Sequence, residues 1–454
     1  MFLGIDFGTT NSVCAIVEEG KPKVLRIDKG GESETLQSVL YVNREHQFLV
    51  GQSAIDKYLW DMENLPATPP ERVATGRIIR IIKDSTPAGG FGGVEDVEEI
   101  IEVDTSGRGR LLQSLKTVLA NSYYRGTEIF NQEYSLEELL SVLLKELKQR
   151  SEKIVGKRID KAVIGRPVRY VGKYPDEKLA IKRMESIAQR AGFSEIKLEY
   201  EPVGAALNFG VNIERDLVVL VFDFGGGTLD TCVMKLPEKK IMAVSGRPIG
   251  GDLLSTEIFK NKLLHYFGSK VTFNEGRSGM PRHLMTSLEN WHTIAQLKKK
   301  QNIDMLEYLI NNADDPGPVK NLRELILSDS GFKIYQKIDG AKVRLSEKDR
   351  AAVVFEGNSF GINEEIIRVE FERMIDSYLG QTKDLLDEVI EMAGIEKDKI
   401  DLVITTGGSS NIPVFKKLLI EYFSSNKVLF GESFTSVAAG LALRADQVFE
   451  NRKY

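Results

Sequence analysis

The chain has 454 residues, of which 42% are hydrophobic and 28% charged, and its formal net charge is −5. This composition is typical of a globular protein and excludes disordered and fibrous classes. No basic block stands out, which argues against nucleic acid as a partner, and four histidines and two cysteines leave little room for a zinc site.

The start of the chain, "MFLGIDFG", lacks the positive segment of a secretory signal. No apolar run approaches the roughly 20 residues that span a bilayer. We therefore expect a cytoplasmic protein with no membrane partner. Cys14 and Cys232 both lie in alternating apolar runs, and we expect buried free thiols at these positions.

Two segments of the chain share one pattern. They are "FLGIDFGTTNSVCAIV" at residues 2–17 and "VVLVFDFGGGTLDTCVMKL" at residues 218–236. Each has an apolar strand ending in Asp-Phe-Gly, a Gly/Thr turn and an alternating second strand, and a third strand follows ("KVLRI" and "IMAV"). Three strands joined by short turns predict an antiparallel meander. Two such copies predict duplicated halves around a shared site.

The glycines of the second copy do not fit a Walker or Rossmann phosphate loop, because both of those loops lead into a helix. Here the glycines lead into an alternating segment that contains the strand formers Thr231 and Val233. We therefore expect Gly225–Thr228 to form a hairpin turn. The backbone N–H groups of such a turn can still bind an anion.

Between the copies, residues 36–109 carry "NLPATPP" and "PAGGFGG" and predict loops, short strands and an exposed insertion. Residues 135–155 predict an amphipathic helix with Ser135 as N-cap and Glu138 at the capping-box position. "IDKAVIGRPV" then predicts a strand that ends near Pro167.

The next elements alternate between helices and strands. We expect a helix at residues 176–193 stopped by Gly192, a short helix beginning at Glu201, and a largely helical stretch at 253–300. After a loop at "NNADDPGPVKN", the pattern predicts in turn a helix at 322–345, a hairpin from "AAVVFEG" to "SFGIN", and one long helix at 363–393.

A third glycine motif lies near the end of the chain, in "IDLVITTGGSSNIPVFKKLLIEYF". Here a strand is followed by Gly407, Gly408 and Ser409 and then by a helix with Pro413 near its first turn. "SFTSVAAGLALRADQVF" predicts a closing helix of small residues.

Carboxylates end both copies of the first strand, at Asp6 and Asp223. Facing each other across a cleft, they could hold a hydrated Mg²⁺ ion, which prefers a few carboxylates together with waters and phosphates. The two Gly/Thr turns would supply amides and hydroxyls to a phosphate chain. One such motif alone is more simply a tight hairpin, but the duplication and the third glycine pair favour a phosphate site.

The motifs taken together resemble those of a known superfamily: "GIDFGTTNS", "VFDFGGGTLD", "EPVGAAL", "PIGGD" and "VITTGGSSNIP" are similar to the nucleotide-site motifs of actin-like ATPases. They most resemble the ATPase domain of DnaK-type heat-shock protein 70 chaperones. Because we expect no substrate-binding domain after the last helix, the chain is also similar to the stand-alone YegD-type branch. The resemblance covers most of the chain and is poor at residues 36–120 and 266–329.

This resemblance implies an α/β protein with the actin-like ATPase fold. Two lobes, each with a ribonuclease-H-like βββαβα core, would surround a nucleotide cleft. Lobe I would span residues 1–213 with an irregular insertion at 36–120, and lobe II residues 214–430 with a helical subdomain at 253–345. Residues 431–454 would form a C-terminal helix that returns to lobe I.

The resemblance also implies roles for individual residues. The metal and its waters would be positioned by Asp6, Asp223 and Asp230. The catalytic residues would be Lys116, Glu201, Asp223 and Thr228. The nucleotide would be bound by Gly8, Thr9, Thr10, Asn11, Gly225, Gly226, Gly227, Thr228, Gly250, Gly251, Asp252, Asp339, Lys342, Ser346, Gly407, Gly408 and Ser409.

Three of these roles have alternatives. Glu201 would accept a hydrogen bond from the metal-bound or attacking water, although a carboxylate at a helix start is also favoured by the helix dipole. The lysine that stabilises the transferred phosphoryl group would be Lys116, with Lys83 as its rival. Pro167 resembles the proline that couples nucleotide state to lobe motion, and it could equally mark a strand end.

The adenine end departs from the family pattern. "IDGAKVRLSE" resembles the helix that clamps adenosine, but Val343 stands where the family has an arginine, and Asn411 replaces the second arginine. Chaperones of this family stack adenine between those two arginines. We therefore expect weaker and less adenine-selective binding.

The leading functional hypothesis is a chaperone-like ATPase that uses ATP or ADP and Mg²⁺, with K⁺ as a further candidate cofactor. Its partners would be the nucleotide and a protein client or co-chaperone acting in trans. Two alternatives stay open: a small-molecule kinase of the sugar or acetate type, and a nucleotide sensor or filament-forming protein that hydrolyses slowly or not at all.

Overall fold

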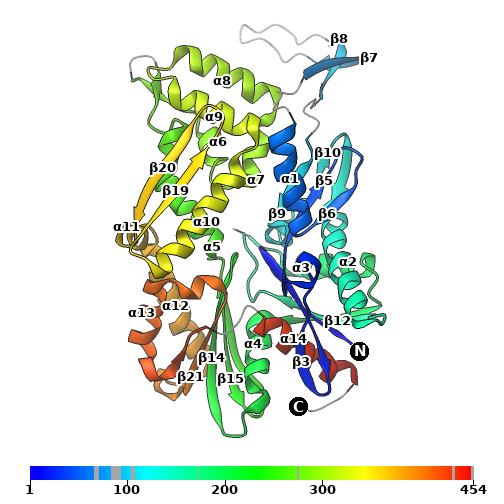
Figure 1. Ribbon diagram of the computed structural model, residues 1–454, viewed down its shortest axis with the longest axis vertical. Helices are drawn as coiled ribbons and strands as arrows, with labels where there is room; N and C mark the ends of the chain where they lie inside the picture. The colour runs from blue at the N-terminus through cyan, green and yellow to red at the C-terminus, as the bar shows by residue number, and fades with distance from the viewer. Residues whose placement is uncertain are drawn as a thin grey trace.

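The computed structural model describes residues 1–65, 71–82, 94–103, 108–172, 174–273, 276–431 and 435–450. Two large sheets lie at the lower end of the molecule, and smaller parts rise from each of them (Figure 1). We call the part built on the six-stranded sheet lobe I and the part built on the five-stranded sheet lobe II. The predicted α/β, actin-like ATPase architecture is confirmed.

The sheet of lobe I has the strand order β13-β12-β1-β2-β3, with β4 also paired to β2. Its strands are β1 (Leu3–Phe7), β2 (Asn11–Glu18), β3 (Lys21–Val24), β4 (Thr35–Gln37), β12 (Lys161–Arg166) and β13 (Glu195–Tyr200). The first three form the predicted antiparallel meander, and β12 runs parallel to β1.

The sheet of lobe II repeats this order as β22-β21-β14-β15-β16. Its strands are β14 (Leu217–Phe224), β15 (Leu229–Leu236), β16 (Lys240–Arg247), β21 (Leu402–Thr406) and β22 (Val428–Leu429). Phe224 pairs with Leu229, so the four residues between them form the predicted hairpin turn. Because each sheet has a meander followed by two parallel strands, the predicted duplication is confirmed.

Helices of lobe I follow the predicted order: α2 (Leu136–Val155), α3 (Glu177–Arg190) and α4 (Glu201–Phe209). The capping box at the start of α2 is confirmed, because Ser135 Oγ accepts the Glu138 N–H and the Glu138 side chain accepts the Ser135 N–H. These contacts satisfy two amides that would otherwise lack partners at the helix start.

The upper part of lobe I contains more structure than predicted. Its elements are β5 (Val39–Val42), β6 (Phe48–Val50), α1 (Gln52–Asn64), β7 (Glu71–Ile82), β8 (Val94–Val103), β9 (Arg110–Gln113), β10 (Gly126–Ile129) and β11 (Gln132–Ser135). The expectation of only loops and short strands here was wrong for α1. That helix buries Ala54, Ile55 and Tyr58, a helical spacing that was present in the sequence.

Lobe II is mostly helical above its sheet. Its elements are α5 (Gly251–Ile258), β17 (Thr272–Phe273), β18 (Ser278–Gly279), α6 (Arg282–Thr286), α7 (Trp291–Ile294), α8 (Lys300–Asn312), α9 (Gly317–Ser328), α10 (Gly331–Glu347), β19 (Arg350–Glu356), β20 (Gly361–Ile367), α11 (Arg368–Met374), α12 (Asp376–Ala393) and α13 (Pro413–Phe423).

Three predictions in lobe II need correction. The helix expected at 322–345 is two helices, because Asp329 adopts φ +57° between α9 and α10. The long helix expected at 363–393 is also wrong: pairing with β19 holds residues up to Ile367 in a strand, and the rest divides into α11 and α12. Residues 253–300 are helical only in part, since β17 and β18 form a short hairpin there.

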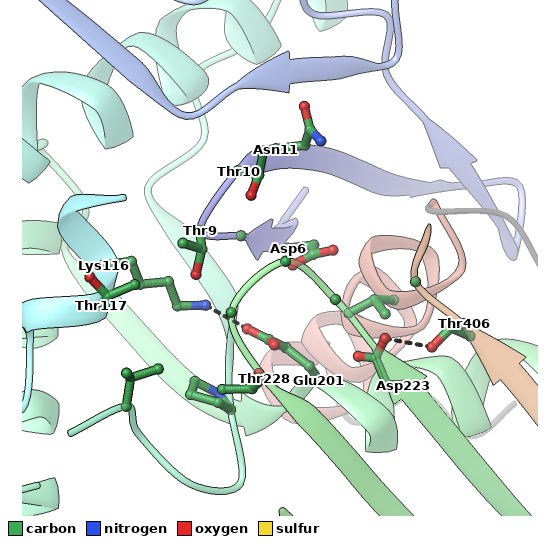
Figure 2. Close-up of a pocket in the computed structure, with 18 of the residues that line it drawn as sticks. Asp6, Thr9, Thr10, Asn11, Lys116, Thr117, Glu201, Asp223, Thr228 and Thr406 are labelled. Atoms are coloured by element: carbon green, nitrogen blue, oxygen red, sulfur yellow. Dashed lines mark hydrogen bonds and ion pairs between the residues drawn. The ribbon is translucent and has the colours of Figure 1, made fainter. Parts of the chain in front are cut away.

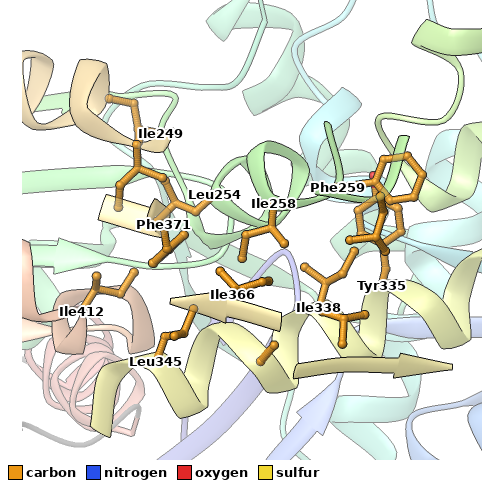
Figure 3. Packing of buried hydrophobic residues seen from close by; sticks show 14 of the residues in the cluster. Ile249, Leu254, Ile258, Phe259, Tyr335, Ile338, Leu345, Ile366, Phe371 and Ile412 are labelled. Atoms are coloured by element: carbon orange, nitrogen blue, oxygen red, sulfur yellow. The ribbon is translucent and has the colours of Figure 1, made fainter. Parts of the chain in front are cut away.

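Lobe II has a continuous apolar core between α5, α10 and β20 (Figure 3). Leu254 and Ile258 of α5 are buried in this cluster with Ile338 of α10, and the rings of Phe259 and Tyr335 stack with centroids 5.2 Å apart. This packing fixes α5 against α10. The polar residues on these two helices therefore keep one position relative to each other.

The last helix, α14 (Ser436–Glu450), packs against β1 and α4 through small residues. A Cβ atom added to Gly4 would lie 2.1 Å from the Ala442 backbone nitrogen, and one added to Gly440 would lie 1.7 Å from the Gly204 carbonyl oxygen. Only glycine permits such close backbone approach. The lobe bounds 1–213, 214–430 and 431–454 stay a prediction.

The two cysteines, Cys14 and Cys232, are buried and free, as predicted. Among the described ranges, no helix has both the length and the apolarity needed to cross a bilayer.

Candidate nucleotide site

The two predicted glycine turns face each other across a cavity between the lobes (Figure 2). A Cβ atom added to Gly226 would lie 2.4 Å from Thr10 Oγ1, and one added to Gly227 would lie 2.9 Å from Thr9 Oγ1. Glycine is therefore required where the turns meet. The cavity is lined by Asp6, Gly8, Thr9, Thr10, Asn11, Lys116, Thr117, Pro167, Tyr170, Val171, Glu201, Asp223, Gly225, Gly226, Gly227, Thr228, Thr406, Gly407 and Val437.

Two aspartates, Asp6 and Asp223, line this cavity, and a third, Asp230, is buried outside its lining. Asp6 lies on β1 and Asp223 on β14, and Asp230 pairs with Asp223 across the hairpin. Asp223 accepts a hydrogen bond from Thr406 Oγ1 at 2.7 Å, and Asp230 accepts one from the Val168 N–H at 3.0 Å. The second bond joins lobe II to the chain that follows Pro167 in lobe I.

Burial disfavours the charged form of all three aspartates. Burial and the nearby charge of Glu201 raise the pKa of Asp223 to about 7. The same two causes raise the pKa values of Asp6 and Asp230 well above the ordinary range. A cation in the cavity would relieve this repulsion and favour the ionised carboxylates.

The three aspartates suit a metal ion that keeps its water ligands better than one bound by protein side chains alone. Within the part of the chain that the structure describes, no group of three or more His, Cys, Asp or Glu side chains could hold a metal by itself. Mg²⁺ commonly keeps several waters and binds one or two carboxylates together with substrate phosphates. Asp6, Asp223 and Asp230 therefore suit an ion that they position mainly through its waters.

An ion pair crosses the cavity between Lys116 and Glu201 (Figure 2). Lys116 lies in a 3₁₀ turn at Leu115–Val118, Glu201 is the first residue of α4, and Lys116 Nζ donates to Glu201 Oε1 at 2.6 Å. Burial opposes the charge of Lys116, but Glu201 outweighs burial, so the lysine pKa is raised. The rival lysine, Lys83, lies outside the described residues.

The "PIGGD" segment is fastened to the glycine turn of lobe II. The Gly251 N–H donates to the Gly225 carbonyl at 3.0 Å, and the Asp252 N–H donates to the Gly226 carbonyl at 2.9 Å. A Cβ atom added to Gly250 would lie 2.1 Å from the Gly226 carbonyl oxygen. These contacts hold the start of α5 against the glycine turn of lobe II.

The expected adenosine residues are only partly brought together. Lys342 Nζ donates to the Gly251 carbonyl at 2.7 Å and to Asp339 Oδ1 at 2.9 Å, while Ser409 Oγ donates to the Gly225 carbonyl at 3.0 Å. Gly407 lines the cavity between the two glycine turns, which we call the phosphate cavity. Gly408 and Ser346 line neither that cavity nor the second cleft considered below.

The positions of the missing arginines show no substitute. Val343 is 63% exposed on α10, and the neighbouring Arg344 donates to the Ala352 carbonyl at 2.8 Å, which engages it away from the cleft. Asn411 ends the 3₁₀ turn Gly408–Asn411. The adenine end thus has no guanidinium at either expected position.

Sequence reasoning missed several residues that line the cavity: Thr117, Tyr170, Val171, Thr406 and Val437. Thr406 carried a signal, because it directly precedes the third glycine motif. The Tyr170 hydroxyl is buried without a hydrogen-bond partner among the described residues, and burial raises its pKa. Buried polar groups are nearly always paired, so this hydroxyl suits a ligand or water in the cavity.

A family model described as "Hsp70 protein" matches residues 2–67, 115–278 and 328–451. The chain belongs to the Hsp70 protein family. The matched ranges contain every residue that lines the phosphate cavity of this Hsp70-family chain. They omit residues 68–114 and 279–327, which lie within the two regions where the motif resemblance was poor.

The chain is similar to a protein from Solanum tuberosum named "Heat shock 70 kDa protein, mitochondrial". The two are 24% identical over 451 residues, which is 97% of this chain and 54% of that protein. The chain thus spans about half the length of this curated relative. The expected cytoplasmic location stays a prediction.

Proposed function

We propose that this chain binds Mg·ATP between the two glycine turns and hydrolyses it, as a chaperone-like ATPase. The observation that carries this proposal is the facing pair of aspartate-bearing turns with Lys116 and Glu201 between them. Hsp70-family membership supports the same activity.

The turns would bind the phosphates. Backbone N–H groups at Gly8–Thr10 and Gly226–Thr228, with the hydroxyls of Thr9, Thr10 and Thr228, line the cavity and suit an anion. Asp6, Asp223 and Asp230 would hold a hydrated Mg²⁺ ion, which when bound supplies charge neutralisation for the phosphates. K⁺ stays a candidate cofactor.

Hydrolysis would depend on Lys116 and Glu201. Lys116 would donate to the terminal phosphate and stabilise the charge that develops on its oxygens. Glu201 would then orient the attacking water in line with the leaving oxygen. Before nucleotide enters, the two side chains neutralise each other at 2.6 Å, so the phosphate must compete for the lysine.

Lobe closure would be coupled to this chemistry through Asp230. Its carboxylate accepts the Val168 N–H at 3.0 Å, next to Pro167, which lines the cavity. Asp230 would thus belong both to the metal site and to this inter-lobe bond, so occupation of the site would affect the contact between the lobes. A protein client or co-chaperone acting in trans would respond to the resulting lobe position.

A small-molecule kinase is the second candidate. One observation favours it: a polar cleft lies directly beside the phosphate cavity and shares Thr10 with it. If this candidate holds, ADP production rises only when one particular hydroxylated metabolite is present, whereas an ATPase releases phosphate with water alone.

Phosphate release from ATP tests the proposal. We expect Mg²⁺-dependent release by the unaltered chain and a loss of about 10²-fold or more in Asp223→Asn, because its buried carboxylate would orient the ion's water shell. Asp96→Asn is the matched control, since Asp96 is an exposed partner of Arg80 and should leave the rate unchanged. Equal rates in Asp223→Asn and the unaltered chain would refute the mechanism.

A further inference from the structure

A second cleft lies between the lobes, above the phosphate cavity. Its volume is about 360 Å³, within the range of about 300–1,000 Å³ that small-molecule sites occupy. Lobe I contributes residues on or near β4, β5 and β9, and lobe II contributes residues of α5 and α10 and Asn290 before α7 (Figure 1). Thr10 is the single lining residue that it shares with the phosphate cavity.

Four side-chain amides line this cleft: Gln37, Gln113, Asn290 and Gln336. Within the described ranges, none of these four side chains makes a hydrogen bond. Gln37 and Gln113 belong to lobe I, and Asn290 and Gln336 belong to lobe II. Each amide offers donors and an acceptor. A hydroxyl group also donates and accepts, so amides on opposite walls match a ligand that carries several hydroxyls.

The charges of the cleft disfavour an anionic ligand. Its ionisable acids are Asp252 and Asp339, and no lysine, arginine or histidine is among its lining residues. Asp339 accepts hydrogen bonds from Ser255 at 2.6 Å and from Lys342 at 2.9 Å, which orients its carboxylate. A cation does lie beside the cleft, Lys342, but Asp339 and the Gly251 carbonyl already engage it. A phosphate or carboxylate placed here would therefore meet Asp252 without a free cation among the lining residues.

The remaining wall is aromatic. Phe332 and Tyr335 line the cleft from α10 and are held in place, because Phe332 packs edge-on against Tyr58 and the Tyr335 hydroxyl donates to the Leu288 carbonyl at 2.9 Å. Small-molecule sites are commonly lined by aromatic side chains together with a few polar groups that point at the ligand. It suits the C–H face of a hydroxylated ring or chain.

We propose that this cleft binds a neutral, hydroxyl-rich small molecule of monosaccharide or polyol size. The ligand would bridge the lobes, since Ser114 of lobe I and Asp252 of lobe II both line the cleft. Thr10 Oγ1 is buried without a partner among the described residues, and it stands at the junction of the two cavities. Bound ligand and bound nucleotide would therefore favour the same closed lobe position.

The competing occupant is the nucleoside end of ATP, because Asp252 and Asp339 are the residues expected near the ribose. The geometry favours a separate ligand. Lys342 and Ser409 direct their polar groups to the Gly251 and Gly225 carbonyls of lobe II, whereas the amides Gln37 and Gln113 project from lobe I. This inference does not require ATP hydrolysis and stands if the chain only binds nucleotide.

Calorimetric titration of the full chain with glycerol, D-glucose and D-mannitol tests the inference. We expect at least one of them to bind with a Kd below about 10 mM, and to bind more tightly when Mg·ADP is saturating. Glucose 6-phosphate should bind at least about tenfold more weakly than glucose, because no cation is among the lining residues and Lys342 beside them is already paired with Asp339.

Variants locate the binding. Gln113→Ala and Gln336→Ala should each weaken binding of the sugar or polyol by about tenfold, since each removes a hydrogen-bonding group from one wall of the cleft. Gln301→Ala on the exposed face of α8 is the matched control and should change nothing. An unchanged Mg·ADP affinity in each variant shows that it folds.

Three results would overturn the inference. The first is that none of the three compounds binds up to about 50 mM, a concentration at which a specific site would be occupied. The second is that binding persists unchanged in both glutamine variants. The third is that adenosine or ADP displaces the compound competitively, which would assign the cleft to the nucleoside.

Discussion

Lys116 Nζ lies 2.6 Å from Glu201 Oε1, and the two side chains are only 9% and 12% exposed. The pair joins the upper part of lobe I to the start of α4, and both groups line the phosphate cavity. Removing one partner of a shielded pair leaves the other charge uncompensated. The pair therefore links the position of the lysine to the orientation of the glutamate.

Replacing the lysine should uncouple nucleotide binding from hydrolysis. In Lys116→Met we expect phosphate release to fall by about 10²- to 10³-fold, because one donor to the developing charge is lost. Mg·ADP affinity should change by less than about tenfold, since the two glycine turns remain. Single-turnover phosphate release and calorimetry measure the two effects.

Lys23→Met is the control for this substitution, because Lys23 forms a comparable but exposed pair with Glu18. It should match the unaltered chain in both measurements. If Lys116→Met releases phosphate at the normal rate, Lys116 is not the phosphate lysine, and the role returns to Lys83.

The partly buried Asp223 predicts how stability depends on pH. Burial raises its pKa to about 7, whereas an unfolded aspartate titrates near about 3.9. The folded state therefore holds this proton more tightly, and the stability that it contributes is complete below about pH 4 and lost as pH rises through about 7. Asp6 and Asp230 act in the same direction.

We expect the free energy of unfolding of the nucleotide-free chain to fall between pH 5 and pH 8, about the interval of this titration. Asp223→Asn should reduce that fall by up to a few kcal/mol, because the amide cannot ionise. Denaturant titrations at both pH values measure this. An equal fall in Asp223→Asn and the unaltered chain would show that Asp223 is not buried as described.

The adenine end should bind weakly and with little selectivity. With Val343 and Asn411 in place of arginines, we expect ADP and GDP affinities within about tenfold of each other. The double substitution Val343→Arg and Asn411→Arg should tighten ADP binding by about tenfold or more, because guanidinium groups would stack on the base. Calorimetry with both nucleotides checks this.

Val354→Arg on β19 is the control for added charge, because Val354 is exposed outside the site. It should leave both affinities unchanged. Tight ATP binding with strong rejection of GTP by the unaltered chain would contradict this account of the adenine end.

The sequence predicted the parts of the molecule where local pattern and tertiary structure agree. The two meanders were predictable because their strands alternate and their turns are glycine-rich. The α2 helix was predictable because Ser135 and Glu138 form a capping box within four residues. At such positions, local interactions and the global fold favour the same conformation.

The predictions that failed depend on distant contacts. Residues 363–367 have a helix-like sequence, but pairing of Asn363 with Val354 places them in β20. The second cleft was not predicted at all, because Gln37, Gln113 and Gln336 are unremarkable surface residues until the two lobes bring them together. Thr406 could have been inferred, since it adjoins Gly407 in the sequence.

The most direct test of the central claim is single-turnover phosphate release by Glu201→Gln with Mg·ATP. The glutamine keeps the size of the side chain but cannot orient the attacking water as a carboxylate does. We predict ATP affinity within about tenfold of the unaltered chain and phosphate release slower by about 10²-fold. Release at the same rate in both proteins would contradict the proposed mechanism.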